Sequence, residues 1–401
     1  MGYRFMDHKA YGRVLKYESI KCLEEKYSLP LYIYDENIAI ANAREIKKCL
    51  GKEVRLCYSA KANYYLAEAV GEIADMIEVS TIKELQYCLK QRISADRLIY
   101  SGVWKSKEDF DYVLKAGVDR IVLDSVKQTS ELQNIARGTV EVLLRLSSGN
   151  QFGMNVEEIE QIIKYAGIYD NLNIVGIQYY AGTQRKCLSQ VQRDIKKFAD
   201  QLQYLEEKGI CFKEVQIGGG IGVPLFYSER KEEFEEAADC MFAFIEKLSI
   251  NYKVTYECGR GIAANAGQYV TQVFDRKLRY DRDVLLIRGG NNHLSYYGNI
   301  CGQRQPFIES VIREEKKGPE YKYMICGSLC SANDILSMEY IDYSIEEGDY
   351  IIFYNVGAYS LQEAATLFLA MEMPRILVHS KDYNGHRVLE LEWMNNECTG
   401  I

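Results

Sequence analysis

One strand–helix pattern recurs eight times between residues 54 and 260. In each repeat, a short apolar run rich in β-branched and aromatic residues ends in a small or polar residue, and an amphipathic stretch of mixed charge follows. The eight runs cover residues 54–61, 76–80, 98–102, 120–125, 140–147, 173–182, 214–220 and 254–260. Such alternation predicts a parallel sheet, and eight repeats favour a closed (β/α)8 barrel. A doubly wound open sheet is the competing architecture.

The pattern changes after about residue 267. From there, strand-like runs follow one another without long helices between them, which is typical of a mostly antiparallel β domain. We therefore expect a barrel domain over residues 31–268 and a second, mostly antiparallel β domain formed by residues 1–30 and 269–401. The chain has only five prolines and no low-complexity linker, so we expect the two domains to pack closely.

Composition argues against several classes of function. The 401 residues carry a formal net charge of -8 and no long basic block, which argues against binding to nucleic acid or a membrane surface. No run approaches the roughly 20 apolar residues of a membrane helix. The N-terminus has no apolar signal-like segment, so we expect a cytoplasmic protein. The 12 cysteines form no Cys-x-x-Cys pair, and with only four histidines no metal site is expected.

The carboxyl ends of the predicted strands are polar. In a (β/α)8 barrel these ends form the active site. Strand ends are generally more polar than strand middles, but that trend does not account for so many ionisable and glycine positions. The positions concerned are Lys61, Glu78, Ser80, Arg145, Tyr180, Thr183, Gly218, Gly219, Gly220, Glu257 and Arg260.

Three of these motifs suggest chemistry. A lysine at a buried strand end, such as Lys61, either uses its amine as a nucleophile or extends to the rim. The run Gly218–Gly220 lets backbone N–H groups approach a phosphate, although a tight turn explains it equally well. Glu257 can keep a pyridine nitrogen protonated, or it can form an ion pair with Arg260 that closes the barrel.

The second predicted domain adds a thiol and a phenol. Cys330, with Asp334 four residues later, can return a proton to carbon, although a lone cysteine is more often a buried structural thiol. The Tyr359 hydroxyl can bind phosphate.

In this order and spacing, the motifs resemble the fold-type III pyridoxal-phosphate (PLP) decarboxylases. This family includes the ornithine, arginine and diaminopimelate decarboxylases and has alanine racemase as a fold relative. The similarity runs from residue 32 to beyond residue 359. It implies that Lys61 is the Schiff-base lysine, that Glu257 faces the pyridine nitrogen and that Cys330 is the acid that protonates carbon. The resemblance assigns the phosphate to Gly218, Gly219, Gly220, Gly259, Arg260, Thr183 and Tyr359, and the cofactor side of the pocket to Glu78, Glu84 and Arg145.

The resemblance also implies a homodimer with shared active sites, because Cys330 and Tyr359 lie in the segments that cross the dimer in that family. This sequence departs from the family pattern at Tyr180, where the ornithine branch has a histidine; an aromatic ring can still stack on the cofactor. Arg288 stands where many members have aspartate, and a cation there repels a cationic distal amine. Ser331 follows Cys330, where an acidic residue is common.

These departures predict an amino-acid substrate with an anionic far end, contacted by Arg288 and Asp334. The motifs look most like the decarboxylases of carboxylate siderophore pathways, or of natural-product pathways that use carrier-tethered amino acids. The alternatives are a diaminopimelate or basic amino-acid decarboxylase, an amino-acid racemase that would need a second base opposite Lys61, and a catalytically silent homologue that binds partner proteins. Retention of Lys61, Glu257, Cys330 and Tyr359 argues against the silent homologue.

Overall fold

The computed structural model describes residues 2–4, 15–279, 282–313, 318–380 and 386–389. It divides into two compact units. The first consists mainly of Ile40–Val223 and Lys231–Ile262. The second consists mainly of residues 224–230 and everything from Ala263 onward, with the segment that ends at Ala39.

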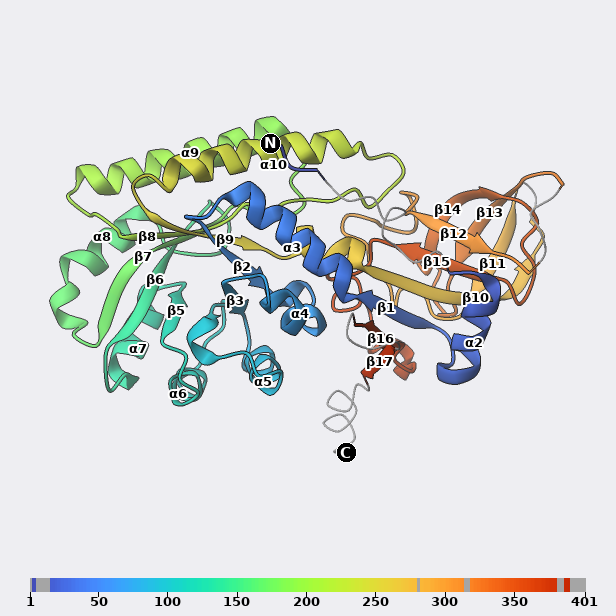
Figure 1. The fold of residues 1–401 in the computed structure, drawn as a ribbon, viewed down its shortest axis with the longest axis horizontal. Coiled ribbons are helices and arrows are strands. Elements are labelled where there is room, and N and C mark those ends of the chain that lie inside the picture. Colours follow the sequence, from blue (N-terminus) through green and yellow to red (C-terminus); the bar gives the residue numbers. More distant parts are fainter. Residues whose placement is uncertain (1, 5–14, 280–281, 314–317, 381–385, 390–401) are drawn as a thin grey trace. The chain divides into compact units, whose positions relative to one another are not determined.

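The first unit contains the predicted eight-stranded parallel barrel. Neighbouring strands pair in parallel all the way round, and β2 closes the circle by pairing with β9, with Cys57 opposite Glu257. Figure 1 shows the strands in sequence order around the barrel. Closure excludes the doubly wound open sheet. The strands are β2 (Arg55–Ser59), β3 (Met76–Val79), β4 (Leu98–Tyr100), β5 (Arg120–Leu123), β6 (Val140–Leu146), β7 (Leu172–Tyr180), β8 (Glu214–Gly218) and β9 (Lys253–Cys258).

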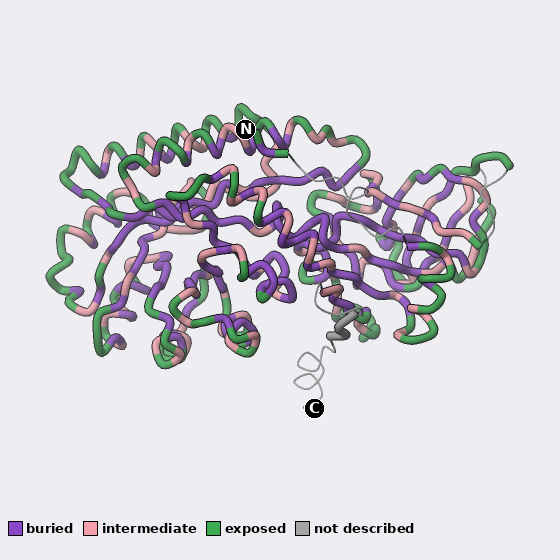
Figure 2. Tube along the Cα trace, viewed as in Figure 1, coloured by how far each residue is buried: buried purple, intermediate pink, exposed green. Residues whose placement is uncertain are grey.

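Amphipathic helices surround these strands. Side-chain caps fix the first turns of four of them, α5 to α8; Asn155 and Glu158, for example, form a reciprocal capping box at the start of α8. Ile159 and Ile162 of the same helix are buried, and Figure 2 shows exposed residues along the outer sides of the helices. The helices are α3 (Glu36–Leu50), α4 (Ala67–Gly71), α5 (Ile82–Lys90), α6 (Lys107–Lys115), α7 (Val126–Ile135), α8 (Val156–Lys164), α9 (Leu188–Glu207), α10 (Lys231–Leu248) and α11 (Arg260–Ala263).

Most of the predicted strands extend beyond the observed ones at their carboxyl ends. Lys61 lies in η1 (Ala60–Ala62), a single 3-10 turn directly after β2, and Arg260 is the first residue of α11. Gly220 has a φ of +62°, which ends the extended backbone after β8. The residues of interest therefore lie on the turns just beyond the strands, while the strands supply a rigid apolar base. One apolar layer of that base comprises Cys57, Met76, Ile99, Val122, Leu143 and Val175.

The second unit is built on a nine-stranded mixed sheet. Among the described residues, six of its strand pairings are antiparallel and two, β1–β16 and β11–β13, are parallel. Its strands are β1 (Leu31–Asp35), β10 (Gly267–Lys277), β11 (Asp283–Ile287), β12 (Ile308–Val311), β13 (Tyr321–Cys326), β14 (Ile335–Asp342), β15 (Tyr350–Tyr354), β16 (Arg375–His379) and β17 (His386–Leu389).

Strand β1 differs from the sequence-based boundary. Residues 31–35 were expected in the barrel domain, but β1 pairs with β10 and β16 of the second sheet. Its side chains Leu31 and Ile33 join Ile20 of α2 (Tyr17–Tyr27) in the core of this unit. A short apolar strand suits either sheet, and only the pairing partners, far away in sequence, decide between them.

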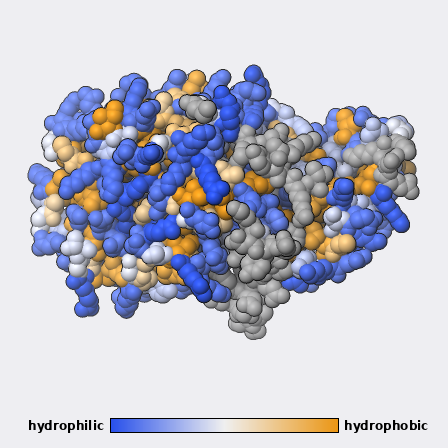
Figure 3. Space-filling model, viewed as in Figure 1, coloured by the Kyte–Doolittle hydropathy of each residue, from blue (hydrophilic) through white to orange (hydrophobic). Residues whose placement is uncertain are grey.

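None of the helices in the described part of the chain is long and apolar enough to cross a membrane. The described residues on the face drawn in Figure 3 are mainly hydrophilic, with hydrophobic groups scattered among them. Throughout the described residues, no group of three or more histidine, cysteine, aspartate or glutamate side chains is arranged so that it could hold a metal ion.

Candidate active site

A cavity of about 600 Å³ lies at the carboxyl end of the barrel. Residues at or just beyond the ends of six strands line it, as expected for this fold. These residues include Lys61, Glu78, Tyr100, Arg145, Tyr180 and Glu257.

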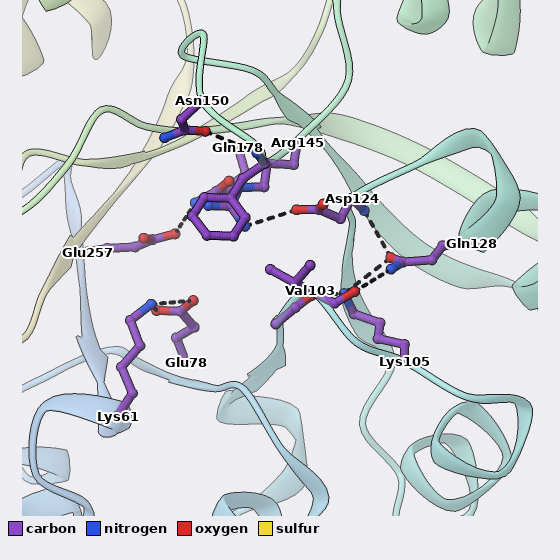
Figure 4. Close-up of polar contacts among 12 residues, drawn as sticks. Lys61, Glu78, Val103, Lys105, Asp124, Gln128, Arg145, Asn150, Gln178 and Glu257 are labelled. Carbon is purple, nitrogen blue, oxygen red and sulfur yellow. Dashed lines mark hydrogen bonds and ion pairs between the residues drawn. The ribbon is translucent and has the colours of Figure 1, made fainter. Parts of the chain in front are cut away.

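Lys61 and Glu78 form an ion pair on the cavity wall. The Lys61 Nζ lies 3.2 Å from both carboxylate oxygens of Glu78, as Figure 4 shows. Burial alone would raise the pKa of Glu78, but Lys61 and the hydroxyls of Ser59 and Ser101 outweigh it, so this pKa is lowered. The carboxylate therefore stays ionised and holds the amine at the cavity.

Glu257 lies in a different electrostatic environment. Its Oε1 accepts hydrogen bonds from the side-chain amides of Gln178 at 3.0 Å and Gln216 at 2.6 Å. Burial, reinforced by the nearby charge of Glu78, raises the pKa of Glu257. Within the described residues no hydrogen bond reaches Oε2, so a cationic N–H donor in the cavity would stabilise the ionised carboxylate.

The sequence reasoning did not identify Gln178 and Gln216. Each lies two residues before a position that it did identify, Tyr180 on β7 and Gly218 on β8. Because side chains alternate between the two faces of a strand, residues two apart share a face. A polar residue within an apolar strand, two positions before a predicted site residue, was the sequence feature that could have identified both glutamines.

Tyr180 and Gly218 pack against each other beside the amine. The Lys61 Nζ is 5.7 Å from the centre of the Tyr180 ring. A Cβ at Gly218 would lie 2.5 Å from a carbon of that ring and 3.0 Å from Oε2 of Glu257. Glycine at 218 is therefore what allows the aromatic ring and the carboxylate to approach each other.

A possible anion site follows β8. A Cβ at Gly220 would lie 2.0 Å from the carbonyl oxygen of Gly182, so the two loops touch through their backbones. The Arg260 Nε–H donates to the Thr183 hydroxyl at 3.3 Å. Among the hydrogen bonds of the described residues, none uses the N–H of Gly219 or Gly220. Both sequence interpretations of this glycine run therefore fit, because the tight turn also leaves two donors for an anion. Gly259, just before Arg260, is half-buried. Its role in binding phosphate stays a prediction.

Arg145 lies on the other side of the cavity. Its Nη1 donates to Asp124 at 2.9 Å, and its guanidinium carbon is 4.8 Å from the centre of the Phe152 ring. Asp124 follows β5 directly, and the sequence reasoning passed over it although it lies one residue before the end of the predicted run 120–125. Glu84 has a local role, accepting the backbone N–H of Ser80 at 2.7 Å.

The remaining candidates, Cys330, Asp334, Arg288 and Tyr359, belong to the second unit. Cys330 is exposed on the loop after β13. Asp334 was expected to bind substrate, but it is only 3% exposed, and its two carboxylate oxygens accept the backbone N–H groups of Asn291 and Leu329 at 2.7 and 2.8 Å. Because both oxygens are occupied inside the unit, Asp334 fixes the loop that carries Cys330.

Arg288 was also expected to bind substrate. Its Nη1 lies 3.3 Å from Oε1 of Glu24 on α2, so a carboxylate of the protein already balances its charge. Tyr359, after β15, has a φ of +67°. A left-handed conformation is strained for tyrosine, and strain of this kind concentrates at functional sites.

The groups of the barrel unit match what PLP would present to them. Lys61 offers an amine for the aldehyde, and Glu257 offers an oxygen for a protonated pyridine nitrogen. Tyr180 offers an aromatic face for the ring. The N–H groups of Gly219 and Gly220, close to Arg260 and Thr183, suit a phosphate.

Comparison with known proteins agrees with this fit. Residues 38–264 match the model of the pyridoxal-binding domain of pyridoxal-dependent decarboxylases. The diaminopimelate decarboxylase of Aquifex aeolicus is 24% identical over 382 residues, which cover 90% of this chain and 89% of that protein. The L-glutamyl-[BtrI acyl-carrier protein] decarboxylase of Niallia circulans is 24% identical over 383 residues, covering 88% of this chain and 90% of that protein.

Solved structures agree on the fold. The diaminopimelate decarboxylase from M. jannaschii in complex with L-lysine superposes with a TM-score of 0.79 at 23% identity, covering 91% of this chain and 90% of that one. A lysine/ornithine decarboxylase from Vibrio vulnificus complexed with putrescine gives 0.79 at 22% identity, covering 92% and 99%. The chain therefore belongs to the fold-type III pyridoxal-dependent decarboxylases, enzymes that use pyridoxal 5'-phosphate to decarboxylate amino acids.

Proposed function

We propose that this enzyme decarboxylates an amino acid, free or conjugated, whose far end carries a carboxylate or an acyl linkage. We place it in a specialised pathway such as siderophore or natural-product assembly. The observation that carries the reaction class is the Lys61–Glu78 pair opposite Glu257 in one cavity. Support for the substrate class comes from the Niallia circulans relative, which is named for a carrier-bound glutamyl substrate and aligns along nearly the whole chain.

The barrel residues have distinct roles in this proposal. Lys61 holds the cofactor through its amine, and Glu78 keeps that amine at the cavity wall. Glu257, oriented by its two glutamine neighbours, accepts a hydrogen bond from the pyridine nitrogen. Gly219 and Gly220 bind the phosphate, together with the other residues that the resemblance assigned to it. When bound, PLP supplies the electron sink for the carbon that loses CO2.

Cys330 is the proposed proton donor to that carbon. Its exposed position on a loop that Asp334 fixes suits a residue that works beside a partner surface. We propose a homodimer in which Cys330 and Tyr359 complete the active site of the other subunit. In this arrangement the barrel holds the cofactor and the second unit delivers the proton.

A diaminopimelate decarboxylase is the second candidate. Several relatives carry that name, including those of Aquifex aeolicus and Haemophilus influenzae. Diaminopimelate also has a carboxylate at its far end. The Arg288–Glu24 ion pair removes the charge argument that the sequence offered for an exclusively anionic far end, so substrates have to be compared directly.

The test is a CO2-release assay on the PLP-loaded enzyme. The substrates are meso-diaminopimelate, L-lysine, L-ornithine, L-glutamate and glutamate bound as a thioester to an acyl-carrier protein. We expect the carrier-bound glutamate to have the highest kcat/KM and the two basic amino acids the lowest. Highest activity on lysine or ornithine would overturn the proposed substrate class. Chiral analysis of each recovered amino acid tests the racemase alternative, which requires inversion without CO2 release.

A further inference from the structure

The loop between β4 and α6 forms the outer part of the cavity wall. Gly102, Val103 and Trp104 all line the cavity. Val103 is 47% exposed and Trp104 is 81% exposed, so two large apolar side chains stand at its mouth. Gly102 has a φ of +100°, and a Cβ there would lie 2.3 Å from the carbonyl oxygen of Ser80. The loop backbone therefore rests directly on the segment that follows β3.

Lys105 anchors this loop from its buried side. It is only 5% exposed, and its ammonium donates to the carbonyl oxygen of Gly102 and to Oε1 of Gln128, the latter at 3.3 Å. The Nε2 of Gln128 in turn donates to the carbonyl oxygen of Val103 at 2.7 Å. Figure 4 shows the side chains of Lys105 and Gln128 converging next to Val103. Two consecutive carbonyls of the loop are thus fixed by two buried side chains.

Gln128 also connects this loop to residues of the inner cavity. Oε1 of Gln128 also accepts the backbone N–H of Asp124 at 3.0 Å, and Asp124 binds Arg145. The cation of Lys105 forms no ion pair with a carboxylate in the described part of the chain. Burial lowers the pKa of Lys105 to about 7, with Arg145 also lowering it and Asp124 and Glu78 raising it. A buried cation without an ion pair is costly, and an apolar residue would pack at no such cost.

We propose that Lys105 is a positioning residue: with Gln128 it fixes the Gly102–Trp104 loop so that Val103 and Trp104 contact the part of the substrate remote from the reacting carbon. The occupant we assign to this wall is the acyl linker of a carrier-bound amino acid, and this assignment rests on the proposed function. Lys105 itself touches neither the substrate nor the cofactor.

The loop anchor can be tested without any substrate. The chain has two tryptophans, Trp104 and Trp393, so Trp393→Phe leaves Trp104 as the single fluorophore. In that background, Lys105→Met should lower the fluorescence anisotropy of Trp104 and increase its quenching by acrylamide. Lys115→Met is the matched control, because Lys115 is an exposed lysine on the neighbouring helix α6 and, among the described residues, its ion pair is with Asp111. It should leave both signals unchanged.

A second variant keeps this test decisive if Lys105→Met fails to fold. Gln128→Leu retains the lysine but removes the hydrogen bond to Val103, and should produce the same change in Trp104. PLP affinity, measured by titration, should stay within about twofold, because neither substitution replaces a residue assigned to the cofactor and the Asp124–Arg145 ion pair is retained. Unchanged anisotropy and quenching in the folded variants would overturn the positioning role.

The substrate contact needs its own measurement. Trp104→Ala should raise KM for carrier-bound glutamate about tenfold, a typical cost of losing apolar contacts, with little change in kcat. It should leave KM for free glutamate within twofold. Tyr165→Ala removes an exposed aromatic elsewhere on the barrel unit and serves as the control. Equal effects on both substrates, or no turnover of the carrier-bound one by the wild type, would refute the linker contact, while the fluorescence result would still decide the role of Lys105.

Discussion

Each end of the barrel contains a glutamate, and the two glutamates lie in opposite electrostatic environments. Glu214 begins β8 at the amino end, and Glu257 lies near the carboxyl end of the adjacent β9. Glu214 is surrounded by Arg120 at 2.6 Å, Arg55 at 2.8 Å and Lys253 at 3.1 Å. Although burial opposes it, Arg120 and Arg55 lower the pKa of Glu214 to about 2. Glu257 has two neutral amides instead, and its pKa is raised.

The difference shows which end is built for stability and which for binding. At the amino end the protein supplies its own counter-charges, so the network needs nothing from outside. At the carboxyl end, no hydrogen bond or ion pair of the described residues reaches Oε2 of Glu257. Gln178 and Gln216 each retain a buried side-chain oxygen without a hydrogen bond. A protonated pyridine ring would supply the missing positive charge to Glu257.

The largest expected effect on activity is at Glu257. Glu257→Gln keeps an oxygen acceptor for the neighbouring amides but removes the charge that faces the ring nitrogen. We expect kcat to fall about 100- to 1,000-fold, the usual cost of losing one preorganised electrostatic contact. Steady-state CO2 release on the PLP-saturated variant measures it. A kcat within fivefold of the wild type would show that this carboxylate does not tune the cofactor.

The amino end should behave in the opposite way. Glu214→Gln leaves three cations without their shared carboxylate, and we expect the free energy of unfolding to fall by about 3 kcal/mol. Urea unfolding at pH 7 measures this loss. The folded variant should keep its kcat, because Glu214 lies at the end of the barrel opposite the cavity. A large loss of kcat with unchanged stability would reverse the roles that we assign to the two ends.

The two glutamates should also give opposite pH dependences. Burial and the charge of Glu78 raise the pKa of folded Glu257 to about 7, above its value in the unfolded chain. Between about pH 5 and 7.5 its ionisation should therefore cost the cofactor-free protein about 2–3 kcal/mol. Glu257→Gln should remove this decline, and so should saturation with PLP. The contribution of Glu214 is present at neutral pH and is lost only as the pH falls below about 4.5. Thermal unfolding of the wild type and both variants across this range tests the contrast. Parallel curves for the wild type and Glu257→Gln would contradict it.

The smallest effect is expected at Arg288. Its half-exposed ion pair with Glu24 is worth about 0–1 kcal/mol. Because Glu24 already pairs with Arg288, Arg288→Ala should change kcat/KM less than twofold on every substrate tested. A tenfold loss confined to substrates with an anionic far end would instead restore the substrate contact that the sequence suggested.

The sequence predicted the features that depend on local periodicity. The strand–helix rhythm was enough to predict the barrel, and charged or glycine residues at strand ends identified Lys61, Glu257 and the run after β8. It did not indicate the long-range partners. Glu24, which lies 264 residues before Arg288, balances its charge, and nothing local to Arg288 reveals that pair.

The glutamines of the site could not be predicted for a related reason. From the sequence alone, a glutamine looks like an ordinary surface residue. Only the fold shows that Gln178 and Gln216 contact Glu257 and that Gln128 contacts the Gly102–Trp104 loop. The β1 boundary failed similarly, because a five-residue apolar strand does not specify its sheet.

Lys61 is the residue that we expect to hold the cofactor at the carboxyl end of the barrel. Borohydride reduction of the PLP-loaded protein, followed by mass analysis of its peptides, tests this expectation most directly. We predict one pyridoxyl adduct, on the peptide that contains Lys61, and none after the same treatment of Lys61→Ala. An adduct on another lysine of the wild type, or one that persists in Lys61→Ala, would contradict the account.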